Sequence, residues 1–453
     1  MTLKQLSDAS VQAQVQTGLA ARDDVAIVQA LATQALLYPQ QVGALGFARW
    51  AASLRRLKFW DAAQAVLAQA SAQGHATMAL AIEAAELANA RKRPEQAAAL
   101  WWDALAAGQA KVGPTTWLRA INSQIRVWRL DAAQSLLNLA RAQHPSDQSL
   151  QKKELEWQAM SAVEAKIVLD IAGNCRITWY RQKNPASTVV VTFATLYSDL
   201  DTPVFGFPFV LMQGWDHVHV AQAAGSQYQL LSRDDFARWV GPLVRDRAVW
   251  TYGSSLGGYA AIYYADTLGA RAIASSPSLP AHPLSTRFPR DKRPILHAPL
   301  EQFQTDARAY IFYDPEDAPD RLFIESLVLP ACRNAIAIRL PYAGHQALRQ
   351  LASADLLKPT LVQLIAHAPD SLVLDNARLE SCPVYLEERA AAMARAGQWN
   401  DVLALTQRSV ALAPSLKAYK LLLRAAGELG LGDQMEPHYT VAVRRYGLAK
   451  VRA

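Results

Sequence analysis

The stretch AVWTYGSSLGGYAAIYY, residues 248–264, contains a β-branched and aromatic run, a corner bounded by glycines, and a helical segment rich in small residues. It matches the pattern G-x-S-x-G through Gly253, Ser255 and Gly257. In this pattern the serine stands on a sharp turn between a strand and a helix, and the glycines leave room for that turn. We therefore expect a strand, a helix that begins at Leu256, and a serine hydroxyl that projects from the turn as a candidate nucleophile.

The segment around this stretch, residues 163–368, differs in texture from the rest of the chain. Short β-branched runs alternate with helical segments, which is typical of α/β proteins with a mostly parallel sheet and helices on both faces. The first two runs could form a hairpin, and functional sites of such sheets lie at the carboxyl ends of the strands. The runs expected to be strands are KIVLDI, RITWYR, TVVVTFA, HVHVAQ, AVWTYG, RAIASS, AYIFYD and NAIAIRL.

Two later strand ends carry side chains that could act together with Ser255. The expected strand AYIFYD runs into an acidic cluster that contains Asp314, Asp317 and Asp320. The next expected strand is followed by LPYAGHQAL, which places His345 in a turn before a helix. A serine, an acid and a histidine that each follow a parallel strand could meet at one edge of the sheet, where the histidine would serve as the base for the serine.

The order serine, acid, histidine and the G-x-S-x-G turn make residues 163–368 resemble α/β-hydrolases. The resemblance implies that Ser255 attacks an acyl carbonyl and that His345 takes up the serine proton and passes it to the leaving group. It also implies a carboxylate that orients the imidazole. No cofactor follows from the sequence, because it contains no phosphate loop, no H-E-x-x-H pair and no dinucleotide fingerprint, and we expect no metal.

The resemblance leaves the acid open. Asp317 stands where the acid would fall if YDPED forms the usual turn, Asp314 lies directly at the strand end, and the two weigh about equally. Asp320 comes third, since we expect it to begin the following helix and to cap it. The implied oxyanion donors are the backbone N–H groups of Leu256 and of Ala194, which lies in a turn that lacks the HGGG-like run of common lipases.

The series VTFA, FGF, YGSSLGGYAA, FYDP and AGH resembles hydrolase-like proteins of bacterial surface-glycan biosynthesis. This resemblance implies a small-molecule or glycan ester as substrate. Two reactions are open on the same triad, hydrolysis by an esterase and acyl transfer to a glycan, because water or another nucleophile can resolve an acyl-enzyme. A non-catalytic scaffold that carries an inactive hydrolase domain is the third possibility.

Both flanks of this segment have the composition of amphipathic helices. The acidic residues Asp61, Glu95 and Asp131 lie 34 and 36 positions apart, each followed by small alanines, and a similar unit after residue 370 repeats its glycine from Gly397 to Gly430. A period near 34 resembles tetratricopeptide repeats, which implies a surface for a protein partner.

We therefore expect three domains: tetratricopeptide-like repeats over 1–162, an α/β-hydrolase domain over 163–368, and further helical repeats over 369–453. The 46 Lys and Arg residues exceed the 39 Asp and Glu residues, but this excess is diffuse, so we expect no nucleic-acid partner. Three widely spaced cysteines, no leader and no apolar run long enough to span a membrane predict a cytoplasmic protein.

Overall fold

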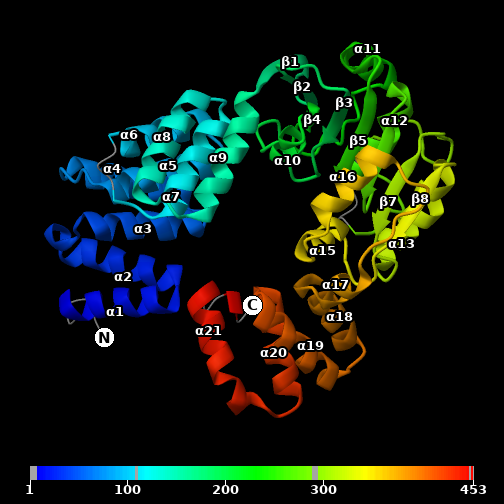
Figure 1. Cartoon of the computed structure of the whole chain (residues 1–453). Coiled ribbons are helices and arrows are strands. Elements are labelled where there is room, and N and C mark those ends of the chain that lie inside the picture. The colour runs from blue at the N-terminus through cyan, green and yellow to red at the C-terminus, as the bar shows by residue number, and fades with distance from the viewer. Residues whose placement is uncertain (1–7, 108–110, 288–293, 448–449, 452–453) are drawn as a thin grey trace. The chain divides into compact units, whose positions relative to one another are not determined.

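The computed structural model describes residues 8–107, 111–287, 294–447 and 450–451 (Figure 1). The chain forms two compact units, Met1–Trp157 together with Leu431–Ala453, and Gln158–Gly430. The second unit contains the sheet, and the first consists of helices.

The sheet has eight strands in the order β1-β2-β4-β3-β5-β6-β7-β8 among the described residues. β1 and β2 form an antiparallel hairpin, β2 pairs antiparallel with β4, and all other neighbours are parallel. Each of the eight runs expected from the sequence forms a strand, so the prediction of a mostly parallel sheet is confirmed. The strands are β1 (Val163–Ile171), β2 (Cys175–Gln182), β3 (Thr188–Phe193), β4 (Asp216–Gln222), β5 (Ala248–Ser254), β6 (Arg271–Ser275), β7 (Ala309–Tyr313) and β8 (Ala335–Arg339).

Burial explains which runs became central strands. β3 and β4 are almost wholly buried, although β4 contains polar side chains, whereas most residues of the edge strand β1 are exposed or half-buried. Val191 and Phe193 share an apolar cluster with residues of α11, α12 and α13, while Val190 and Trp250 share another with residues of α10, α15 and α16. The covering helices are α10 (Phe207–Met212), α11 (Arg233–Val244), α12 (Leu256–Ala265), α13 (Ala318–Phe323), α15 (Ala347–Ser353) and α16 (Leu357–His367).

The helices that follow α16 share a core with the sheet. Tyr385, Val402 and Ala425 belong to the same apolar cluster as Trp250 of β5. The structure therefore has no boundary between compact units near residue 368, because α17 to α20 pack with the sheet unit. These helices are α17 (Asn376–Ser381), α18 (Pro383–Arg395), α19 (Trp399–Leu412) and α20 (Leu416–Glu428).

The helices of the other unit follow one another through a recurring turn. Lys58, Lys92 and Trp128 each have a positive φ, of 67°, 57° and 58°. Each turn also closes with the same backbone hydrogen bond, five residues back along the chain, such as that from Phe59 N–H to Leu54 O. The helices are α1 (Asp8–Ala21), α2 (Asp24–Leu37), α3 (Ala44–Arg56), α4 (Trp60–Ala72), α5 (Met78–Ala90), α6 (Pro94–Leu105), α7 (Pro114–Arg126), α8 (Leu130–Gln143), α9 (Gln148–Ser161) and α21 (Glu436–Tyr446).

Within the described residues, none of these helices combines the length and the apolar character that crossing a bilayer requires.

Candidate active site

Ser255 lies on the sharp corner between β5 and α12, with φ 56° and ψ −121°. A residue with a Cβ rarely adopts a positive φ, so the surrounding backbone must hold this conformation. A Cβ built on Gly253 would come within 2.1 Å of the Gly257 carbonyl oxygen, and one built on Gly257 within 2.6 Å of the Phe193 carbonyl oxygen. Only glycine fits at these two positions, which is the steric reason for the motif.

His345 lies in the turn between β8 and α15, and its Nε2 is 2.9 Å from the Ser255 hydroxyl oxygen. Its Nδ1 lies 2.8 and 2.9 Å from the two carboxylate oxygens of Asp320. An ionised carboxylate only accepts hydrogen bonds, so Nδ1 carries the proton and Nε2 can accept one from the serine. The structure thus brings Ser255 and His345 together, as the sequence led us to expect, in the geometry that proton transfer requires.

The carboxylate beside the imidazole is Asp320, and the two preferred candidates from the sequence lie elsewhere. Asp317 caps the N-terminus of α13, where it accepts from the Asp320 N–H at 3.3 Å, and it forms an ion pair with Arg287. The expectation that Asp320 caps this helix is therefore wrong, because the cap is Asp317. Pro319, the second residue of α13, could have indicated this, because proline is tolerated only in the first turn of a helix and so indicates that the helix begins before Asp320.

Asp314 is occupied by the backbone of the histidine turn. Its carboxylate accepts hydrogen bonds from the N–H of Gly344 at 2.8 Å, of Tyr342 at 3.1 Å and of Glu316 at 2.8 Å. Burial raises the pKa of this carboxyl above its ordinary value, although the three N–H donors oppose that shift. Asp314 therefore ties the end of β7 to the turn that carries His345, and does not itself form the expected contact with the imidazole.

The two expected oxyanion donors differ in whether their backbone N–H group already has a hydrogen-bond partner. Leu256 is the first residue of α12, where backbone N–H groups have no partner inside the helix. The N–H of Ala194, in contrast, donates to Val220 O at 3.1 Å, because the ladder between β3 and β4 continues one residue past β3. Ala194 is therefore not available as a donor, and the next N–H along this turn belongs to Thr195.

Two buried histidines of β4 could have supplied a metal site. His217 and His219 both contact the Thr192 hydroxyl, at 2.6 and 2.9 Å. Burial lowers the pKa of both imidazoles, that of His219 to about 3, so both are neutral. In the described part of the chain, no group of three His, Cys, Asp or Glu side chains is placed to hold a metal ion.

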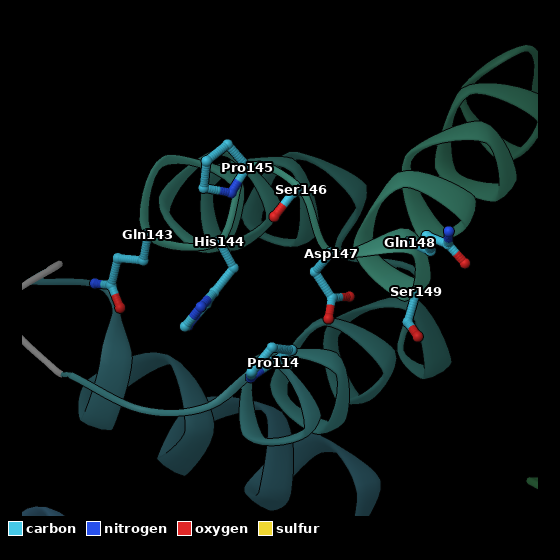
Figure 2. Close-up of a pocket in the computed structure, with 8 residues that line it drawn as sticks. All are labelled: Pro114, Gln143, His144, Pro145, Ser146, Asp147, Gln148 and Ser149. Atoms are coloured by element: carbon cyan, nitrogen blue, oxygen red, sulfur yellow. The ribbon is translucent and has the colours of Figure 1, made fainter.

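A hollow of about 600 Å³ lies in the helical unit, remote in sequence from these residues, and is lined by Pro114 and by residues 143–149 (Figure 2). His144 Nε2 lies 2.8 Å from Val112 O, and Asp147 accepts from Leu150 N–H at 2.9 Å. These polar groups therefore hold the connection between α8 and α9.

No family model and no curated protein matches the chain. Among solved structures, an esterase of Pyrobaculum calidifontis is 16% identical and aligns over 49% of this chain and 92% of its own, with a TM-score of 0.33. Carboxylesterase CesB of Bacillus subtilis is 14% identical over 49% of this chain and 99% of its own, with a TM-score of 0.31. Dienelactone hydrolase of Anabaena variabilis is 13% identical over 45% of this chain and 97% of its own, with a TM-score of 0.31.

Proposed function

We propose that the protein is a serine esterase in which Ser255 is the nucleophile, His345 the general base and Asp320 the carboxylate that orients the imidazole. The supporting observation is the continuous row of hydrogen bonds from Asp320 through His345 to Ser255 at the carboxyl edge of the sheet. Asp320 is only 3% exposed, so its charge acts on the imidazole with little screening by water.

In the first half of the proposed reaction, the Ser255 oxygen forms a bond to the ester carbonyl carbon while its proton moves to His345 Nε2. The carbonyl oxygen becomes negative and is stabilised by the N–H groups of Leu256 and Thr195. A single donor of this kind contributes about 10² to 10³ in rate. The tetrahedral intermediate then breaks its bond to the leaving oxygen, which takes the proton from His345 and departs as an alcohol.

In the second half, water attacks the acyl-enzyme and gives one proton to His345. The bond to Ser255 breaks, the serine oxygen recovers that proton, and a carboxylic acid leaves. An acceptor hydroxyl of a glycan in place of water would turn the same steps into acyl transfer. Asp320 stabilises the imidazolium that exists between the steps and needs no proton of its own.

The proposal includes a recruiting role for the helices outside the sheet. Their recurring turns and their period near 34 residues support the resemblance to tetratricopeptide repeats, whose surfaces suit peptides and proteins. On this basis the helical segments would bring a protein partner or a substrate to Ser255 in a cytoplasmic protein.

The test has two separate assays on the full chain. One is labelling with a fluorophosphonate probe, and the other is hydrolysis of p-nitrophenyl acetate by unlabelled protein. We expect labelling of the wild type and of Ser254→Ala, the neighbouring serine of the motif, and none of Ser255→Ala. Labelling that persists in Ser255→Ala would refute the nucleophile, and an unlabelled wild type would favour the scaffold. Adding glycerol or a monosaccharide during turnover separates the two reactions, because only an acyltransferase would divert most of the acyl group to the acceptor.

A further inference from the structure

Arg287, which the proposed chemistry does not use, lies against the carboxylate of Asp320. Its Nε is 3.1 Å from Asp320 Oδ1, and its Nη2 contacts Asp317 Oδ1. The same Asp320 carboxylate accepts from His345. Together with the contact between His345 and Ser255, the contacts of Asp320 form one hydrogen-bonded row that begins at Arg287 and ends at Ser255.

The charges around this row explain why an arginine is needed there. Asp317 and Asp320 lie three residues apart in the first turn of α13, and the side chain of Asp320 is almost completely buried. Two carboxylates so close repel each other unless a cation lies between them. Burial alone would lower the pKa of the Arg287 guanidinium, but the two carboxylates outweigh burial and raise it, so the cation is permanent.

Among the residues that the structure describes, two other charged groups near the histidine turn have partners of their own. Asp314 accepts from the backbone of the turn, and a Cβ built on Gly344 would lie 3.3 Å from the carboxyl carbon of Glu388 in α18. Lys417 forms an ion pair with Glu388 at 2.5 Å and so offsets its charge. Within the described part of the chain, Arg287 contacts the proposed catalytic acid Asp320 directly.

We propose that Arg287 is a positioning residue that fixes the orientation of the Asp320 carboxylate and moderates the negative charge that His345 experiences. The kinetic consequences of this inference rest on the proposed function, whereas its structural basis is the set of contacts that Asp320 makes. Arg287 contacts the carboxylates of Asp317 and Asp320, so we assign its effect on His345 to the contact with Asp320.

Arg287→Gln and Arg287→Lys separate charge from geometry. Without the cation, the imidazole takes up a proton at higher pH, and since it must be neutral to accept the serine proton, the acidic limb of kcat/KM moves to higher pH. We expect a displacement of about one pH unit in Arg287→Gln, the size that a close charge produces. We also expect kcat to fall by about tenfold, as a lost charged hydrogen bond implies, with KM for p-nitrophenyl acetate nearly unchanged. In Arg287→Lys we expect the acidic limb of kcat/KM to return to its wild-type position, whereas kcat should recover only in part.

Arg247→Gln is the matched control. Arg247 Nη1 lies 2.6 Å from the buried carboxylate of Asp216, at the start of β4 and so at the opposite edge of the sheet from Ser255. This variant loses a comparable buried ion pair. We expect its thermal stability to be reduced and the acidic limb of kcat/KM to stay where it is in the wild type. The proposal would be overturned if Arg287→Gln left both kcat and the acidic limb of kcat/KM unchanged. It would also be overturned if Arg247→Gln moved that limb by the same amount as Arg287→Gln.

A second readout does not depend on turnover. The histidines are labelled with ¹³C, and His345 is assigned by its loss in His345→Gln. Its titration midpoint is then compared between the wild type and Arg287→Gln. We expect the midpoint to rise in the variant, and equal midpoints would overturn the inference about Arg287. If the wild type neither labels nor hydrolyses esters, the proposed function fails, but this titration still decides whether Arg287 acts on the histidine.

Discussion

At the end of β5 the backbone itself holds Ser255, whereas at the end of β7 three aspartates within seven residues are distinguished only by what each one contacts. The corner at Ser255 is enforced by carbonyl oxygens that leave no room for a Cβ at Gly253. Beyond β7, Asp314 binds backbone N–H groups and Asp320 binds the imidazole. A backbone clash is local and independent of partners, while a carboxylate takes whichever donors the fold brings to it.

The first way to break this comparison is to exchange Asp320 for its amide. Asp320→Asn can present the wrong hydrogen-bonding group to His345 Nδ1, so we expect esterase activity to fall by about 10³ to 10⁴. The change is isosteric, and the fold should persist. Steady-state hydrolysis of p-nitrophenyl acetate measures the effect, and circular dichroism checks the fold. An Asp320→Asn enzyme with near wild-type activity would remove Asp320 from the proposed triad.

The second test addresses the β5 corner. Gly253→Ala places a Cβ 2.1 Å from a carbonyl oxygen of the same turn, so backbone must move, and we expect a loss of about 3 kcal/mol or more in the free energy of unfolding. Urea denaturation provides the measurement. Gly241→Ala in α11 is the control, because a Cβ there meets nothing within 4 Å. That variant should be no less stable than the wild type, and equal losses in both would mean that the corner is not sterically special.

The difference between the strand ends also decides what could be predicted from the sequence. The strands and the corner follow from apolar runs and from glycine spacing, which are local properties. The choice of Asp320 depends on Arg287 and His345, which come from segments 33 and 25 residues away in the chain. The loss of Ala194 as a donor depends on the register between β3 and β4. Pro319 is a local sign that α13 begins before Asp320, which argues against Asp320 as its cap.

A third test concerns the aspartate that caps α13. Asp317→Ala removes the acceptor of the Asp320 N–H and one partner of Arg287. We expect a loss of about 1 kcal/mol in stability, as for other N-cap deletions. The activity should fall less than about tenfold, because the contact between Arg287 and Asp320 remains. Urea denaturation and ester hydrolysis give the two values. A loss of activity as large as that of Asp320→Asn would mean that the carboxylates of Asp317 and Asp320 act as a single unit.

The smallest expected effect is at Asp314, where stability and pH are linked. Because burial raises the pKa of this carboxyl, the folded chain binds its proton at higher pH than the unfolded chain does. As the pH falls from 7 toward about 4, the wild type therefore gains stability from this group, and the gain is lost again as the pH rises. Asp314→Asn is neutral at every pH and lacks this dependence.

We therefore expect Asp314→Asn to differ from the wild type by no more than about 1 kcal/mol at pH 7, since relief from burying a charge opposes the loss of one acceptor. The stability of the variant relative to the wild type should then decrease in acid. Urea denaturation of both proteins at pH 7 and pH 4.5 measures this trend. The opposite trend would mean that the N–H groups of Gly344 and Tyr342 dominate over burial. Asp314 would then hold the histidine turn through its charge, and the end of β7 would depend on electrostatics at two aspartates instead of one.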